Sequence, residues 1–203
     1  MVSSARHREG ERSVNVSDPT SPSGERPNRK PMRLPNHDYS EDGAYFVTIC
    51  VEGRRCLLGE VVGDRVVLTP LGDAVAECWQ AVGGHFGGVE LGPFVVMPNH
   101  VHGIVWIARE SGGEASKGLA LTNVLPSSDG GVVGAPTLGQ IIGWFKYEST
   151  KRINAVRGTP GMRFWQRNYY DHIVRTEEGL YRIAEYIEGN PSSWRRDEMN
   201  PDK

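Results

Sequence analysis

Two histidines on one predicted strand are the residues of this sequence best suited to chemistry. His100-Val101-His102 follows Pro98-Asn99 and opens a run rich in Val, Ile and Trp. The Pro-Asn pair is typical of a turn or bulge, and the run is typical of a buried strand. Strand side chains alternate, so both imidazoles lie on one face, about 6.6 Å apart along the strand. Two interpretations stay open: a site for one divalent cation, or ordinary residues on a half-exposed face. We expect the two side chains to lie on a rim and to contribute little core burial.

A tyrosine near the end of the chain is the second candidate. Tyr186 lies at the edge of the apolar stripe of a predicted helix, and Asn190 follows four residues later. Residues at i and i+4 share one helical face. Tyr181 lies on the same helix but about 140° around from Tyr186. The alternative is a core tyrosine whose hydroxyl faces water.

Composition restricts the class of protein. The chain has 203 residues, enough for one domain with a sizeable core. Its formal net charge of -2 does not favour nucleic-acid binding. Lysine and arginine outnumber acids between residues 146 and 196, a pattern that also suits a solvated surface.

Several features indicate a cytoplasmic protein. Three cysteines are present, and they form no CxxC pair, which favours reduced thiols over disulfides or a zinc site. The start of the chain lacks the apolar segment of a signal peptide. No apolar run approaches the roughly 20 residues of a membrane-spanning helix.

The domain organisation follows from composition shifts. Residues 1–32 are poor in aliphatic side chains and are predicted to form a disordered tail. Residues 33–196 form the predicted single domain, and 197–203 a C-terminal tail. Within the domain, residues 109–136 are dominated by Gly, Ser, Ala, Asn and Asp, which predicts a flexible loop insertion.

Strands and helices are predicted throughout the domain. We expect helices to end at the glycine pair 83–84 and at Gly189 with Pro191. Trp165, Tyr169 and Tyr170 are either core residues or surfaces on which bases stack. The predicted elements are strands over 44–51, 61–68 (a hairpin about Gly63-Asp64), 89–97 and 100–107, part of a strand within 164–175, and helices over 69–82, 137–156 and 176–188.

Taken together, the motifs resemble a known family. The chain has Met-Pro-Asn-His-Val-His at 97–102 and Tyr-Ile-x-x-Asn-Pro at 186–191. In this order and separation they resemble the single-tyrosine HUH transposases, above all the REP-associated tyrosine transposases and their insertion-sequence relatives. The resemblance covers residues 33–194. Further segments that resemble the family lie at residues 45–48, 165–166 and 170–175.

The resemblance implies a fold, a reaction and a set of site residues. The implied fold is a single α+β domain with a central antiparallel, ferredoxin-like sheet and helices packed on it. Tyr186 would be the nucleophile on single-stranded or hairpin DNA and would leave a 5′-phosphotyrosine. His100, His102 and Asn190 would bind Mg²⁺ or Mn²⁺. We expect a cytoplasmic, nucleoid-associated protein that is a monomer or a homodimer.

Three hypotheses follow. The first is this DNA strand-transfer enzyme. The second is a metal-dependent phosphodiesterase in which His100 and His102 activate water and Tyr186 is structural. The third is a domesticated, non-catalytic protein that binds hairpin DNA. The long loop and the weak charge depart from the closest relatives and bear on DNA affinity and target choice.

Overall fold

The structure is a computed structural model that describes residues 38–39, 41–108 and 136–203. The predicted tail over residues 1–32, and the predicted loop over 109–136 except its last residue, lie outside the described residues. Among the described residues, no helix has the length together with the hydropathy that a membrane crossing requires.

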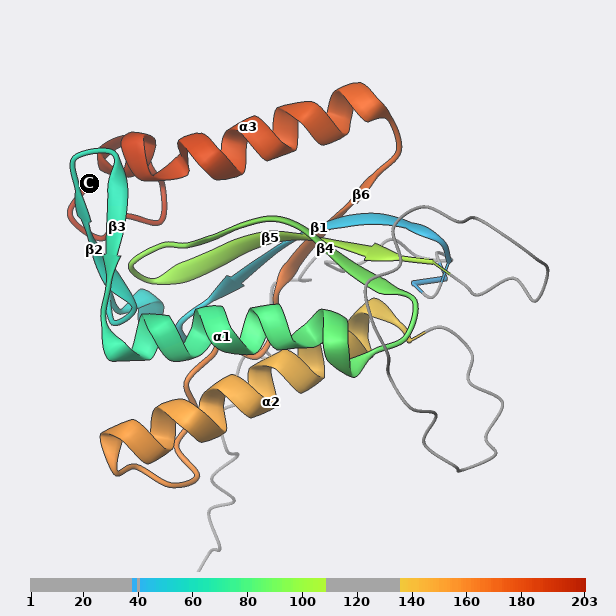
Figure 1. The fold of residues 1–203 in the computed structure, drawn as a ribbon. Helices are drawn as coiled ribbons and strands as arrows, with labels where there is room; N and C mark the ends of the chain where they lie inside the picture. Colours follow the sequence, from blue (N-terminus) through green and yellow to red (C-terminus); the bar gives the residue numbers. More distant parts are fainter. Residues whose placement is uncertain (1–37, 40, 109–135) are drawn as a thin grey trace, which may run out of the picture. The chain divides into compact units, whose positions relative to one another are not determined.

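The order of helices and strands confirms the predicted α+β class. One sheet has four antiparallel strands in the order β4-β5-β1-β6, and β2 and β3 form a separate hairpin (Figure 1). Along the chain, the large sheet and two helices follow a β-α-β-β-α-β order, which is the ferredoxin-like arrangement. The elements are β1 (Gly43–Cys50), η1 (Glu52–Arg54), β2 (Gly59–Val62), β3 (Arg65–Leu68), α1 (Pro70–His85), β4 (Val89–Val96), β5 (His100–Ile107), α2 (Leu138–Arg157), β6 (Tyr170–Val174), α3 (Glu177–Ser193) and η2 (Trp194–Arg196).

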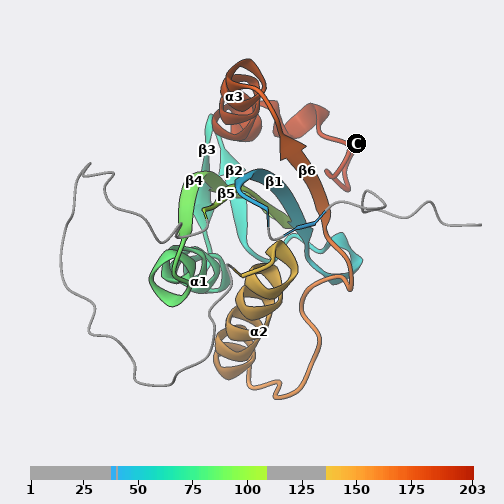
Figure 2. The same cartoon turned by 90° about the vertical axis from the view of Figure 1, so that its right-hand side faces the viewer.

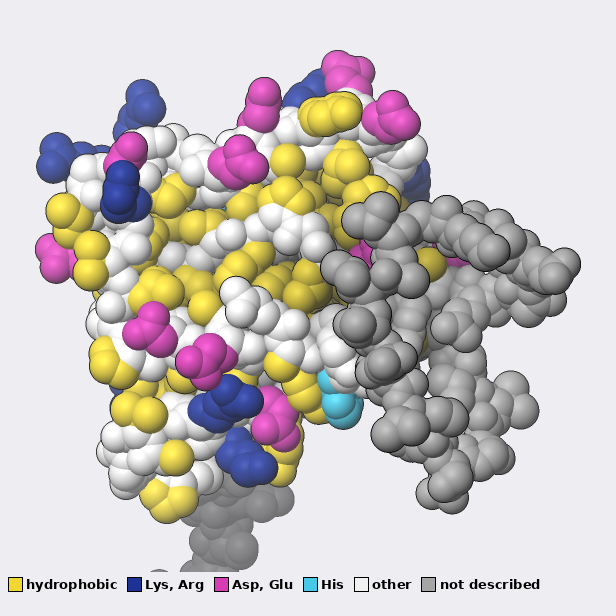
Figure 3. All heavy atoms as spheres, viewed as in Figure 1, with side chains coloured by type: hydrophobic (Ala, Val, Ile, Leu, Met, Phe, Trp, Pro, Cys, Tyr) yellow, Lys and Arg dark blue, Asp and Glu magenta, His cyan; other side chains and the backbone are white. Residues whose placement is uncertain are grey.

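Helices cover both faces of the large sheet. α1 and α2 lie on one face and α3 lies on the other (Figures 1 and 2). The central strand β1 is consequently buried along its length, from Ala44 to Ile49. Figure 3 shows hydrophobic side chains gathered between α3 and the sheet, with acidic side chains on the outer side of α3. The face under α3 is therefore the less completely covered of the two.

Gly103 allows the core to pack closely against β5. A Cβ at this position would lie 2.3 Å from the Trp79 ring, well inside contact distance. Trp79 is 1% exposed and stacks on Phe94, with ring centroids 5.1 Å apart. A glycine directly after His102 thus lets α1 approach the sheet on the face opposite to the histidines.

Both helix ends predicted from glycine and proline are wrong. α1 continues through the glycine pair 83–84 to His85, and the chain turns instead at Gly88, which has φ +71°. α3 continues through Gly189 and Pro191 to Ser193. Asn190 and Pro191 are buried on this helix, so tertiary packing outweighs the lost backbone hydrogen bond of the proline. Asn190 is therefore a helical residue.

Candidate active site

The two histidines lie together on the face of the sheet that α3 covers. His102 is the register partner of Thr48, and His100 is the partner of Cys50, both on β1. The His100 and His102 Nε2 atoms are 3.0 Å apart. The expected rim location is wrong, since the two residues are 0% and 2% exposed. Coverage by α3 and by the C-terminal segment, which the local sequence does not reveal, buries them.

Asn99 orients the His100 ring. Its Nδ2 atom donates to two backbone carbonyls, those of Arg54 at 3.1 Å and Met199 at 2.7 Å. The Oδ1 atom therefore faces His100 Nδ1, at 2.8 Å. Since an amide oxygen only accepts, Nδ1 carries the proton and Nε2 presents a lone pair to the site. The local sequence indicates a turn at Asn99 and gives no sign of this role.

Thr48 holds the second histidine. Its Oγ1 atom lies 2.8 Å from His102 Nδ1, and the Phe46 ring stacks on the imidazole with centroids 5.4 Å apart. When Nδ1–H donates to the threonine hydroxyl, His102 Nε2 also presents a lone pair. Two lone pairs then meet across a short distance, an arrangement that a cation between them would stabilise.

Burial keeps both histidines uncharged at neutral pH. Removal from water, with a contribution from Arg54, lowers the pKa of His100 to about 4. Removal from water and the neighbouring His100 lower the pKa of His102 to about 3, although Asp197 acts in the opposite direction. Neutral imidazole is the form that binds metals.

Helix α3 carries the predicted tyrosine to this pair. Tyr186 Oη lies 3.3 Å from His102 Nε2. The tyrosine ring also meets the Phe46 ring edge to face, with centroids 6.1 Å apart. The neighbouring Ile187 is 1% exposed and belongs to the cluster that joins α3 to the sheet. Ile187 thus anchors α3 to the sheet, and the preceding residue, Tyr186, reaches His102.

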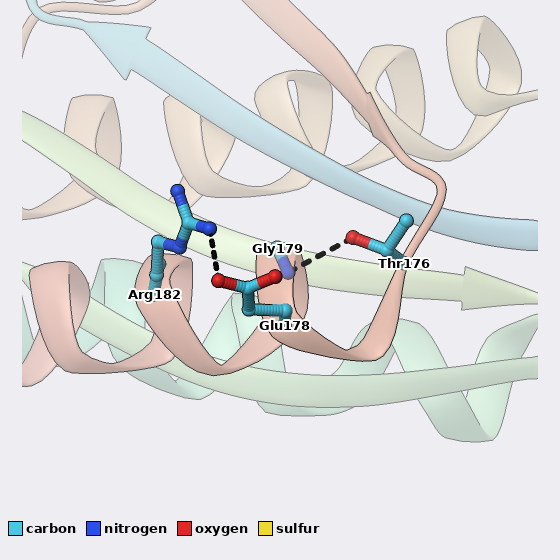
Figure 4. A network of polar contacts seen from close by, with 4 residues as sticks. All are labelled: Thr176, Glu178, Gly179 and Arg182. Atoms are coloured by element: carbon cyan, nitrogen blue, oxygen red, sulfur yellow. Dashed lines mark hydrogen bonds and ion pairs between the residues drawn. The ribbon is translucent and has the colours of Figure 1, made fainter.

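The first turn of α3 fixes where the helix begins. Thr176 Oγ1 accepts a hydrogen bond from the Gly179 amide at 3.1 Å, and Arg182 pairs with Glu178 one turn apart (Figure 4). A threonine cap of this kind contributes about 1 kcal/mol to helix stability. The cap sets the register that brings Tyr186 over the sheet.

Asn190 is the remaining predicted site residue. It is 2% exposed, and its Oδ1 atom has no hydrogen-bond partner among the described residues. Burial, with a contribution from Asp197, raises the pKa of Tyr186, and a hydrogen bond from the Asn190 side chain lowers it by less. An unpartnered buried amide oxygen is costly in a fold and is a good ligand for a hard cation.

Two further features of the site escaped the sequence analysis. Asp197 lies close enough to influence both His102 and Tyr186 electrostatically. The Trp194 ring lies 6.1 Å from the His100 ring, between centroids. Within the described ranges, no third His, Cys, Asp or Glu completes a metal cluster with the two histidines. A cation here would depend on amide, phenol or substrate oxygens.

Comparison with known proteins finds a relative of similar length. The chain is 35% identical to an uncharacterised protein of Haemophilus influenzae over 174 residues, which are 86% of this chain and 94% of that protein. The chain belongs to the family of that protein. No family model matches.

Two solved structures have similar folds. One is a REP-associated tyrosine transposase bound to a REP hairpin, with a TM-score of 0.48 and 19% identity over 79% of this chain and 73% of that chain. The other is a protein of Deinococcus radiodurans proposed to be a transposase, with a TM-score of 0.41 and 16% identity over 77% and 96% of the two chains. At these values the activity has to be argued from the residues of this chain.

Proposed function

We propose that the protein is a single-strand DNA endonuclease and strand transferase that forms a covalent 5′-phosphotyrosine through Tyr186. The observation that carries the proposal is the 3.3 Å approach of Tyr186 Oη to His102 Nε2, between residues far apart in the sequence. Hairpin-flanked DNA is the substrate class that the sequence resemblance favours. The protein would accordingly act where DNA is, in the cytoplasm and at the nucleoid.

The residues fit a divalent cation such as Mg²⁺ or Mn²⁺. The His100 and His102 Nε2 atoms are 3.0 Å apart, so one cation between them would contact both. Asn190 Oδ1 supplies an unpartnered oxygen. His100, His102 and Asn190 would hold the ion, which would polarise the phosphate and stabilise the charge that develops on its oxygens.

The chain supplies the nucleophile and its placement. Tyr186 Oη attacks the phosphorus, the new O–P bond forms, and the bond to the 3′ oxygen breaks. The 3′ oxygen takes up a proton and leaves as a hydroxyl, while the phenol proton passes to water or buffer. Since a phosphotyrosine keeps the phosphodiester's bond energy, a 3′-hydroxyl can reverse the step without ATP. Burial and Asp197 raise the pKa of Tyr186, so the phenol requires help to ionise at neutral pH.

Tyr170 is the surface on which a base next to the cleaved phosphate would stack, on the same face of the sheet as His102. Tyr170 and His102 are both register partners of Thr48, one on each side of β1. Register partners share a face, and Tyr170 is 50% exposed. By contrast, Trp165 is 3% exposed and donates to Ser149 Oγ at 2.8 Å, which makes it a core residue.

The test is a covalent adduct on a denaturing gel. The full chain is incubated with labelled single-stranded hairpins from the DNA that flanks its gene, with Mn²⁺ or with EDTA. We expect an adduct with the wild type and Mn²⁺, and none with Tyr186→Phe or EDTA. Tyr181→Phe is the matched control, because Tyr181 lies on the same helix, is 70% exposed, and should leave the adduct unchanged.

The other outcomes separate the remaining hypotheses. Metal-dependent cleavage without an adduct, unchanged in Tyr186→Phe, would favour the phosphodiesterase. Hairpin binding without cleavage would favour a non-catalytic binding protein. An adduct that survives in Tyr186→Phe would mean that another tyrosine is the nucleophile.

A further inference from the structure

A cavity, which we call the α2 cavity, lies outside the histidine site. It has a volume of about 860 Å³, within the usual range for ligand sites. Its walls come from the second half of α2 and from the segment that follows it, residues 158–167. Phe164 and Trp165, which are 0% and 3% exposed, belong to the core and form part of the lining.

The lining of the α2 cavity is basic. Four cationic side chains line it, and no Asp or Glu does; the cations are Lys146, Lys151, Arg163 and Arg167. The last three are exposed, and within the described part of the chain no carboxylate forms an ion pair with them. In a chain of net charge -2 this is a local concentration of positive charge. Such a surface attracts a polyanion.

The cavity also presents an exposed aromatic ring. Tyr147 on α2 lines it and is 64% exposed. Basic side chains around an exposed aromatic ring are the usual means of binding single-stranded nucleic acid, because phosphates meet the cations and a base stacks on the ring. The ring together with the cations favours a nucleic acid over a lipid headgroup, which offers a phosphate but no base to stack.

Lys146 holds the cavity wall in place. Its Nζ atom donates to the backbone carbonyls of Gln166 at 2.6 Å and Arg167 at 3.1 Å. The lysine therefore ties α2 to the segment that carries two of the arginines. The phosphate-binding side chains would be displayed from a fixed backbone, which lowers the entropic cost of binding.

The same wall joins the histidine site through β1. The Gln166 amide donates to the Cys50 carbonyl at 2.9 Å, and Cys50 is the register partner of His100. Trp165 forms a bridge with Val51, the next residue of the chain. The wall of the α2 cavity therefore adjoins the end of β1 that pairs with His100.

We propose that the α2 cavity binds a single-stranded segment of the DNA substrate. Lys151, Arg163 and Arg167 bind its phosphates, and one base stacks on Tyr147. This inference rests on the proposed function for the identity of the ligand. It concerns binding alone, so it is tested without catalysis.

The test is fluorescence anisotropy with a fluorescein-labelled oligothymidylate and the full chain in EDTA. Lys151→Ala/Arg163→Ala should weaken binding about tenfold at low salt and reduce the slope of log Kd against log salt by about 1.4, since each phosphate contact on a single strand contributes about 0.7. Tyr147→Ala should weaken binding about tenfold, and Tyr147→Phe should restore it.

Arg65→Ala/Arg152→Ala is the matched control. It removes the same charge from two exposed arginines that pair with Asp64 and Glu77 and do not line the cavity. Equal weakening by the control and the cavity variant would indicate a diffuse charge effect and overturn the proposal. Unchanged binding in the cavity variant, or equally tight binding of thymidine monophosphate, would overturn it as well. The adduct assay tests the proposed function independently of this binding assay, because adduct formation depends on Tyr186.

Discussion

Stability should fall steeply with acid because two neutral histidines are buried side by side. Their folded pKa values are about 4 for His100 and about 3 for His102, against about 6.5 in an unfolded chain. Between pH 6.5 and 4 the unfolded state therefore binds protons that the folded state does not. Stability is fully present above pH 6.5 and is lost as the pH falls.

The size of the effect follows from proton linkage. One proton difference changes the free energy of unfolding by about 1.4 kcal/mol per pH unit, so two histidines give a limiting slope of about 2.7 kcal/mol per unit. Between pH 6 and pH 5 this is a large part of the 5–15 kcal/mol that is typical of a domain. The measurement is urea unfolding at constant ionic strength at pH 7, 6 and 5, with metal removed.

A single substitution isolates the source of the slope. His102→Gln removes one buried imidazole, and the slope between pH 6 and 5 should fall by about half. His85→Gln serves as a control for the loss of an imidazole as such, because His85 lies on α1 outside the site and stacks on Trp144 at 4.2 Å between centroids. An undiminished slope in His102→Gln would refute the reasoning, since some other group would then be responsible.

Three further outcomes are expected. Mn²⁺ at a hundred times its Kd should stabilise the wild type by about 2.7 kcal/mol and His102→Gln far less, which calorimetry would measure. Gly103→Ala should lower the free energy of unfolding by about 1–3 kcal/mol, because the new Cβ meets Trp79. Gly143→Ala, in open space on α2, should be neutral or should raise the free energy of unfolding by up to about 1 kcal/mol. Urea unfolding midpoints compare the two variants. Thr176→Ala should cost about 1 kcal/mol and speed amide exchange in the first turn of α3.

Local patterns predicted most of the fold. The alternation after Asn99 gives β5, and Gly63-Asp64 gives the hairpin of β2 and β3. Thr137 predicted the start of α2, where its side chain and that of Gln140 cap each other's backbone amides. These signals succeed because each depends on residues that are close in sequence.

Long-range packing accounts for what the sequence did not reveal. A proline usually ends a helix. Pro191 nevertheless lies inside α3, because its burial with Asn190 outweighs the local preference. The burial of His100 depends on α3 and on the segment after it, including Met199, whose carbonyl accepts from Asn99. Thr48 gave no signal, because its role exists only once β1 and β5 are paired in register. The sequence of one strand does not by itself indicate which distant strand it pairs with.

The site contains a buried polar atom that has no partner in the part of the chain that the structure describes. Buried polar atoms are normally paired, but Asn190 Oδ1 has no partner within the described residues, and two imidazole nitrogens meet 3.0 Å apart. Tyr186 adds a phenol to the same place. An unpartnered buried oxygen costs stability in a protein without a ligand, and a bound cation would satisfy it. The two imidazoles and the phenol already contact one another, so they contribute ligand and nucleophile atoms rather than unsatisfied groups. Folded proteins keep an unsatisfied group where function requires it, and such a group one turn after Tyr186 on α3 is a physical reason to expect chemistry there.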